Sequence, residues 1–334
     1  MSCLGLASHD TLSVMNLQRA FTLAVAATMM CAPALRAQSS MAVLSLPASA
    51  RAAGGGDAAA FATDASALFY GAQRLPRERI ATASAGTWIG DVQLATLAYA
   101  MPIAWQRRAR SVLALGVQSL DYGSADEIIP DPLTGGTRGT PTGDRVGGNE
   151  LALTAGVKQQ TARVRVGFAL SYLRQQVADL SASALTMSAA NGITVRGWDA
   201  DLSVEHATGR ARNPARRSLT IPSTWRGSVA TPAWTLAGAR WRGIAEYRRV
   251  NAAGSTSVLG AEGVFTTATG WELQLRGAGL AYSDETARAP WSAGGGAARG
   301  RWSLDYAYQG FGALGAVHRM GITWRSRDPR NASR

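Results

Sequence analysis

The sequence predicts an all-β protein: a membrane-spanning antiparallel β-barrel of about fourteen strands with a small N-terminal hatch segment. Three observations support this fold class. Apolar and polar residues alternate along most of the chain, which is the pattern of strands with two unlike faces. Many of the alternating segments are longer than the five or six residues that are usual in soluble sheets. An apolar leader of the kind found on exported proteins precedes them.

The leader is assigned to residues 1–37. Residues 15–19 form a short basic segment, residues 20–35 are uncharged and mostly apolar, and Ala37 offers a small residue for cleavage. This is the organisation of a secretory signal peptide, and the apolar run is short for a transmembrane helix. We expect Met15 to be the true start, and the exported chain to reach the outer membrane of a diderm bacterium.

Residues 38–78 follow as a hatch, or plug, segment. They are rich in small residues, with three consecutive glycines, and hold few large apolar side chains. Such a segment cannot bury enough apolar surface to build a core of its own. We therefore expect the barrel to enclose it.

Residues 79–325 hold the predicted barrel strands, and residues 326–334 form a polar tail. Thirteen segments alternate, near 80–88, 92–103, 110–122, 150–160, 162–176, 193–206, 217–230, 234–247, 255–266, 270–282, 290–299, 301–309 and 313–325. Bacterial barrels normally have an even number of strands, so fourteen is the expected total. Residues 126–148, rich in glycine and proline, predict an exposed loop. Residues 180–191, uncharged and rich in serine and alanine, predict a second loop or a short helix.

The two faces of these strands predict two environments. In residues 240–248, Trp241, Ala245 and Tyr247 alternate with charged residues. A closed barrel leaves no unpaired backbone in lipid, so the apolar face would meet lipid and the polar face would line a lumen. A soluble β-sandwich also alternates, but tryptophans near the segment ends favour a membrane barrel. The candidate lumen-facing residues are Arg163, Arg165, Asp199, Asp201, Glu205, Arg240, Arg242, Glu246, Glu272, Arg276 and Asp305.

The composition argues against several functions. The net charge is +12, but Lys158 is the only lysine and the arginines are spread singly or in pairs. This distribution favours a lipid surface over nucleic acid. Cys3 and Cys31 both lie in the leader, so the exported chain would have neither disulfides nor thiolate metal sites.

No catalytic, cofactor-binding or metal site is predicted, and we expect no enzyme. Residues 310–315 match GxGxxG, but a strand follows them where a dinucleotide fold needs a helix. His206 and His318 are isolated. An outer-membrane lipase that uses serine and histidine remains the alternative from this class. Asp199, Asp201 and Glu205 share a strand face, which suits either acid–base catalysis or a charge network with lumenal arginines.

The hatch segment resembles a known family. Residues 51–61 (RAAGGGDAAAF) and 64–70 (DASALFY) are similar to the N-terminal signature of the PorV/PorQ family, roughly ARAxxMGGAFxAxxDDxSALYWNPAGL. Residues 219–227, 304–308 and 314–319 resemble that family too. The chain departs from the signature at Asp57, at Thr63 and in residues 71–75. The hatch motif residues are Arg51, Gly54, Gly55, Gly56, Asp64, Ser66 and Leu68.

The resemblance implies an outer-membrane barrel, related to FadL-type transporters, with the N-terminal segment as an internal hatch. PorV-type members serve type IX secretion, where they accept secreted proteins at the cell surface. We therefore expect the protein to bind or shuttle protein cargo. The alternatives are a FadL-like transporter of hydrophobic small molecules and a structural barrel. The expected partners are outer-membrane lipid and either secreted cargo or hydrophobic ligands, without nucleic acid and without a cofactor.

Overall fold

The computed structural model describes residues 41–326 except 104–109, 131–138, 208–209, 213–217, 252 and 285–287. Residues Ala37–Arg334 form one compact unit. The predicted leader, with Met15 and the cleavage site, lies outside the described residues, as does the polar tail after Ser326. The signal peptide and the tail therefore stay predictions.

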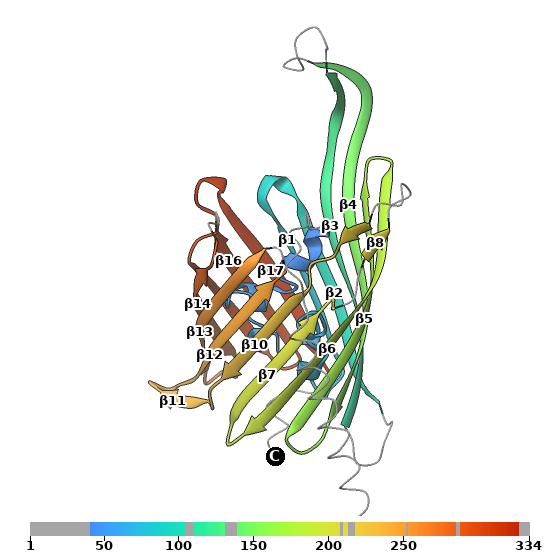
Figure 1. Ribbon diagram of the computed structural model, residues 1–334. Helices are drawn as coiled ribbons and strands as arrows, with labels where there is room; N and C mark the ends of the chain where they lie inside the picture. The colour runs from blue at the N-terminus through green and yellow to red at the C-terminus, as the bar shows by residue number, and fades with distance from the viewer. Residues whose placement is uncertain are drawn as a thin grey trace, which may run out of the picture. The chain divides into compact units, whose positions relative to one another are not determined.

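Fourteen antiparallel strands close into a barrel, which confirms the predicted fold class (Figure 1). The last strand pairs with the first, from Ile80↔Arg325 to Thr87↔His318, so the wall has no free edge. The wall strands are β1 (Ile80–Thr87), β2 (Gln93–Ile103), β3 (Arg110–Pro130), β4 (Gly139–Gln160), β5 (Val164–Val177), β6 (Leu180–Val195), β7 (Trp198–Glu205), β10 (Thr224–Ala230), β12 (Ala239–Val250), β13 (Gly254–Thr266), β14 (Glu272–Tyr282), β15 (Trp291–Arg299), β16 (Trp302–Gly310) and β17 (Ala316–Arg325).

Three short strands and two short helices lie outside this wall. They are β8 (Arg210–Arg212), β9 (Ser218–Thr220), β11 (Trp234–Leu236), η5 (Ile89–Asp91) and η7 (Gly312–Leu314). Among the described residues, no helix is both long enough and apolar enough to span a bilayer.

The strand missing from the sequence prediction is β6. Residues 180–191 were expected to be a loop or a short helix, and this expectation was wrong. The strand pairs with the whole of β5, from Val164↔Ile193 to Val177↔Leu180, through a two-residue turn. Its inward residues are small, such as Ala182 and Ala184, and serine and alanine favour strands weakly. Pairing with its neighbours, rather than its own side chains, therefore makes this segment a strand.

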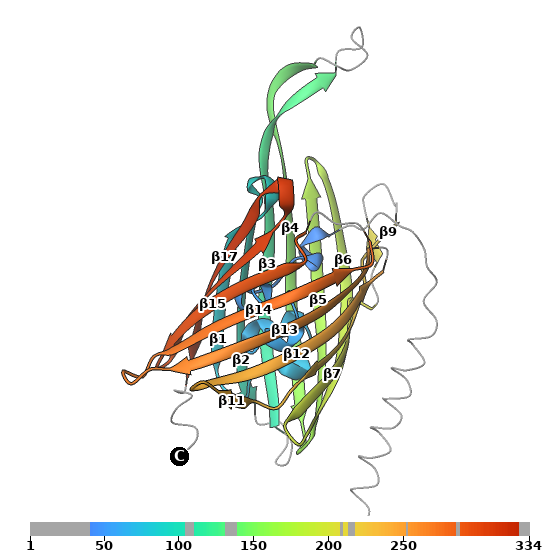
Figure 2. The same cartoon turned by 90° about the vertical axis from the view of Figure 1, so that its left-hand side faces the viewer.

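Residues 126–148 also differ from the expected loop. β3 and β4 continue beyond the other strands as a two-stranded ribbon, residues 122–130 and 139–147 (Figures 1 and 2). The ribbon begins where β3 stops pairing with β2, at Gln93↔Asp121, and where β4 stops pairing with β5, at Gly148↔Val177. We call this end of the barrel the ribbon end. β1 begins and β17 finishes at the opposite end.

Alternation of side chains sets the two faces of the wall. In β2, Leu94, Thr96 and Ala98 are buried, whereas Leu97 and Tyr99 are exposed on the outer face. The same alternation recurs around the barrel, so leucine, methionine and aromatic side chains cover the outside. An apolar exterior of this kind is the surface that a membrane barrel presents to lipid.

The hatch, residues 41–79, lies inside the barrel (Figure 1). Its short helices are η1 (Ala42–Ser45), α2 (Ala50–Ala53), η2 (Ala59–Phe61), η3 (Ala65–Phe69) and η4 (Ala72–Arg74). Ser49 caps α2 by accepting from the Ala52 amide, and Asp64 caps η3 by accepting from the Ser66 amide. The hatch contacts every wall strand. It is rich in alanine and glycine, which lets its backbone pack closely against the wall.

Candidate functional site

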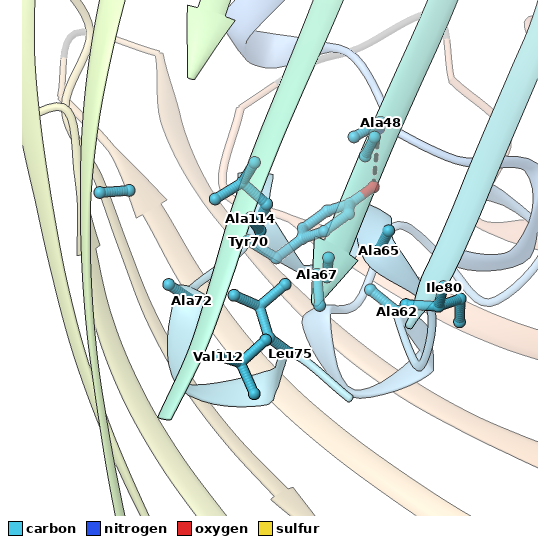
Figure 3. Packing of buried hydrophobic residues seen from close by; sticks show 14 of the residues in the cluster. Ala48, Ala62, Ala65, Ala67, Tyr70, Ala72, Leu75, Ile80, Val112 and Ala114 are labelled. Atoms are coloured by element: carbon cyan, nitrogen blue, oxygen red, sulfur yellow. Dashed lines mark hydrogen bonds between the residues drawn. The ribbon is translucent and has the colours of Figure 1, made fainter. Parts of the chain in front are cut away.

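The candidate functional site is the lumen with the hatch inside it. On the side of β1 to β6 the contact is apolar. Leu68, Tyr70 and Leu75 of the hatch pack against inward side chains such as Val112 and Ala114 (Figure 3). The Lys158 ammonium donates to the Leu75 carbonyl at 2.6 Å, which holds the end of this contact.

Glycines in the wall let the hatch come close on this side. A Cβ atom on Gly116 would lie 2.6 Å from the Phe69 ring. A Cβ atom on Gly167 would lie 2.6 Å from the backbone of Ala72. Both separations are too short for van der Waals contact. At Gly167 the close atoms are backbone, so β5 requires glycine there, whereas at Gly116 the Phe69 ring would have to shift.

At the ribbon end, η1 covers a second apolar patch of the inner wall. Met41 and Val43 pack with Leu94, Leu120 and Leu173, which project from β2, β3 and β5. We call these wall residues, together with Ala152, Ala182, Ala184 and Ile221, the apolar patch. The Val43 amide donates to the Glu150 carboxylate at 2.7 Å.

On the side of β7 to β14 the contact is ionic, and Asp57 is at its centre. Arg248 donates to the Asp57 carboxylate at 2.7 Å, and the Tyr70 hydroxyl donates to it at 2.6 Å. Burial raises the pKa of Tyr70 well above its usual value, and the charge of Asp57 raises it further, so Tyr70 acts as a neutral donor. Its own oxygen accepts from the Ala48 amide at 2.8 Å (Figure 3).

Arg226 connects this centre to two carboxylates of the wall. Its Nε donates to Glu205 at 2.8 Å and its Nη1 donates to Glu246 at 2.9 Å. The guanidinium also lies 5.2 Å from the centre of the Tyr70 ring. Glu246 in turn accepts from the Ala59 amide at 2.7 Å. The hatch is therefore fixed to β7, β10 and β12 by buried charges that satisfy one another.

Arg51 makes a second ionic contact. It is buried, pairs with Glu262, and donates to Gln274 and to the Phe61 carbonyl. Arg276 bridges Glu262 and Asp305 at 3.0 and 2.6 Å. This contact joins α2 to β13, β14 and β16.

Two further contacts close the ring around the hatch. Arg74 of η4 pairs with Asp201 at 2.5 Å, and Arg165 bridges Asp201 and Asp199 at 3.2 and 2.9 Å. On the other side, Arg319 of β17 donates to the Pro47 and Ala48 carbonyls. Carbonyl oxygens in the parts of the hatch that are not helical thus accept hydrogen bonds from wall side chains.

The other predicted hatch motif residues serve the backbone. Gly54 approaches the backbone of Gly294 so closely that an added Cβ would lie 2.8 Å from its Cα. Gly55 lies under the Phe61 ring, and Gly56 has a left-handed φ of 76°. Ser66 is fully buried and its hydroxyl donates to Asp64 at 2.5 Å.

Most predicted lumen-facing residues lie on the inner face, and one does not. Arg163 precedes β5 in an exposed turn, because the strand begins only at Val164. Arg240 is exposed at the opposite end of the lumen, where Arg242 pairs with Asp199. The remainder, Arg165, Asp201, Glu205, Glu246, Glu272, Arg276 and Asp305, point inward.

Sequence reasoning missed several residues of the ionic contact. Three of them, Arg226, Arg248 and Arg319, lie at inward positions of alternating segments. Their place in the alternation could have identified them as lumen-facing from the sequence. Tyr70 and Asp57 had no such signal. Asp57 is a departure from the family signature, and only the fold shows two arginines converging on it.

For three carboxylates the sequence left two interpretations open, acid–base catalysis or a charge network. All three pair with arginine. Asp199, Asp201 and Glu205 contact Arg165 or Arg226, which is the arrangement of a charge network. The Thr186 hydroxyl lies 2.9 Å from His206 inside the barrel, and the Tyr306 hydroxyl lies 2.7 Å from His318 outside it. In the part of the chain that the structure describes, no group of histidine, cysteine and acidic residues could hold a metal ion.

Comparisons with known proteins identify the fold and no family. No family model matches the sequence, and no curated protein matches it. A solved FadL homologue of Pseudomonas aeruginosa is similar in structure, with a TM-score of 0.50 and 11% identity over 83% of this chain and 98% of that one. A TodX deletion mutant, a monoaromatic hydrocarbon channel, reaches a TM-score of 0.49 at 10% identity over 81% and 94% of the two chains. The likeness to the FadL homologue is one of fold.

Proposed function

We propose that the protein is an outer-membrane barrel that passes small hydrophobic or amphiphilic molecules, with the hatch as its gate. The observation that carries this proposal is the apolar patch at the ribbon end. Leu94, Leu120 and Leu173 point into a lumen whose other side is charged, and η1 covers them. A hydrophobic molecule gains free energy in the same place, at roughly 25 cal/mol per Å² of buried apolar surface.

The exterior supports the location in the membrane. The outer face is apolar and the polar side chains are turned inward, which is the distribution that lipid requires. The similar fold of the FadL homologue agrees with this proposal. Because the hatch contacts the wall on all sides, passage requires that the hatch move.

A disulfide between hatch and wall tests the gate. A Cβ on Gly321 of β17 would lie 3.4 Å from the Cβ of Ala50 in α2, close to the spacing of a disulfide. We expect the pair Ala50→Cys and Gly321→Cys, in a background without Cys3 and Cys31, to stop uptake of a fluorescent long-chain fatty acid when oxidised. Reduction should restore uptake.

The matched control joins two wall strands and leaves the hatch free. Thr82 and Thr323 face each other across β1 and β17, with their hydroxyl oxygens 3.2 Å apart. Thr82→Cys with Thr323→Cys should take up the fatty acid equally well in both redox states. Equal uptake by the oxidised hatch pair would rule out hatch movement.

A second candidate function is binding of protein cargo for type IX secretion, as the PorV/PorQ resemblance implies. The ribbon favours it. Ile128 and Ile129 near its tip are 57% and 60% exposed, and its strands lack outer neighbours, so another chain can pair with them. Deleting residues 122–147 should then abolish capture of secreted proteins with a shared C-terminal domain, and leave fatty-acid uptake intact. A barrel that does neither has a structural role.

A further inference from the structure

The lumen contains two cavities with charged groups in their linings, and both lie on the same part of the wall. The ribbon-end cavity has a volume of about 280 Å³, and its lining includes Arg248 of β12, Thr256 of β13 and Tyr282 of β14. The opposite-end cavity has a volume of about 360 Å³, and its lining includes Arg242 of β12 and Glu262 of β13. The two cavities therefore follow the same three strands, one toward each end of the barrel.

Charged groups line both cavities. Asp57, Arg226, Arg248, Asp284 and Arg288 line the ribbon-end cavity. Arg51, Asp199, Arg240, Arg242, Glu262 and Glu272 line the opposite-end cavity. A charged lining favours water and small polar solutes over hydrocarbon. This part of the lumen is chemically unlike the apolar patch on β2 to β6.

A thin part of the hatch separates the cavities. On β13, Thr256 lines one cavity and Glu262 lines the other, and only two inward residues, Val258 and Gly260, lie between them. Hatch residues 54–61, which we call the septum, cover this interval. An added Cβ on Gly56 would lie 2.7 Å from Val258, and one on Gly260 would lie 3.1 Å from the Phe61 ring.

Phe61 is the one large side chain of the septum. It is 1% exposed and packs in an apolar cluster with Ala58, Ala60, Ile244, Val258 and Ala278. The rest of residues 54–61 is glycine, alanine and Asp57. Arg51 fixes the septum from the opposite-end side, because its Nε donates to the Phe61 carbonyl at 3.0 Å while its guanidinium pairs with Glu262. The Phe61 ring thus covers Gly260, and the Gly56 backbone covers Val258, the two residues between the cavities.

We infer that the two cavities are the halves of a hydrophilic route along β12 to β14 for small polar solutes and ions, which the septum closes at Phe61. This function goes beyond the proposed passage of hydrophobic molecules, since it uses a different solute and a different side of the lumen. Opening requires that the Phe61 ring leave Gly260 and that the Gly56 backbone withdraw from Val258.

Liposome swelling with the purified full chain tests the route, with arabinose as the probe solute. Removing the Phe61 ring takes away the side chain that holds the septum against Gly260 and leaves a void between the two charged cavities. We expect Phe61→Ala to raise the swelling rate several-fold above that of the unmodified protein. The milder variant Phe61→Val should raise it less.

Leu68→Ala is the matched control. Leu68 is also a buried hatch side chain, at 2% exposure, but it packs against β3 and β4 on the far side of the lumen. Its truncation should leave the swelling rate unchanged. Retained heat-modifiable migration on gels establishes that each variant is folded, and Phe61→Val replaces Phe61→Ala if the latter does not fold. Equal swelling rates for the Phe61 and Leu68 variants would overturn the inference, whatever the fatty-acid uptake experiment shows.

Discussion

The two sides of the hatch are held by different chemistry. Toward β1 to β6, Leu68 and Leu75 pack against alanine, valine and glycine of the wall. Toward β7 to β14, Asp57 and Arg51 meet buried arginines and carboxylates. Apolar packing is non-directional and tolerates small displacements, whereas a buried charge must keep its partner. The ionic side therefore fixes the position of the hatch, and the apolar side is where the hydrophobic solute of the proposed function would displace it.

Removing Arg226 should have the largest effect on this comparison. Arg226→Met would leave Glu205, Glu246 and Asp57 buried without their shared cation. The expected loss of unfolding free energy is about 3–5 kcal/mol, measured by denaturant unfolding in detergent. The hatch should also become accessible to protease. Arg226→Lys keeps the charge but not the planar fork, so it should recover part of the loss; a Met variant as stable as the parent would contradict the ionic role.

Crowding the apolar side should cost less. In Gly167→Ala the new methyl group would press on the Ala72 backbone at 2.6 Å and push η4 away from β5. Overpacking of this kind costs about 1–3 kcal/mol, measured in the same unfolding experiment. In the control variant Gly277→Ala, the nearest atom would be 3.8 Å away, and stability should not change. Similar losses in both variants would show that close approach of hatch and wall is unimportant.

The smallest effect is expected where an ion pair is exposed. Arg145 and Asp126 lie 3.8 Å apart on the ribbon, with side chains 66% and 74% exposed. Arg145→Ala should cost at most about 0.2–1 kcal/mol, because water screens the pair. A loss as large as that of Arg226→Met would mean that burial is not what makes the lumenal contacts strong.

Sequence reasoning predicted the barrel well and its exceptions poorly. Segments with large apolar residues on one face, such as β12 and β14, alternate plainly, because contact with lipid on the outer face selects those residues. The inner face of β6 has small, uncharged residues such as Ala182, Ala184 and Ala190 in place of the charged residues of other strands, so its alternation carries little signal. The ribbon was expected to be a loop, since glycine and proline mark turns, yet an edge ribbon tolerates both. The PorV/PorQ assignment stays a prediction, because the structural comparisons show a FadL-like fold only.

The sequence alone determined that this chain forms strands with one apolar face. It also determined that the hatch segment before them holds too few large apolar residues for a core of its own. Both follow from the sequence because alternation and composition are local properties of the chain. Only the tertiary structure decided that Asp57 meets Arg226 and Arg248, that Phe61 lies between two polar cavities, and that η1 covers the apolar patch. These contacts join residues far apart in the sequence. They depend on strand register and barrel closure, which no short stretch of the chain specifies.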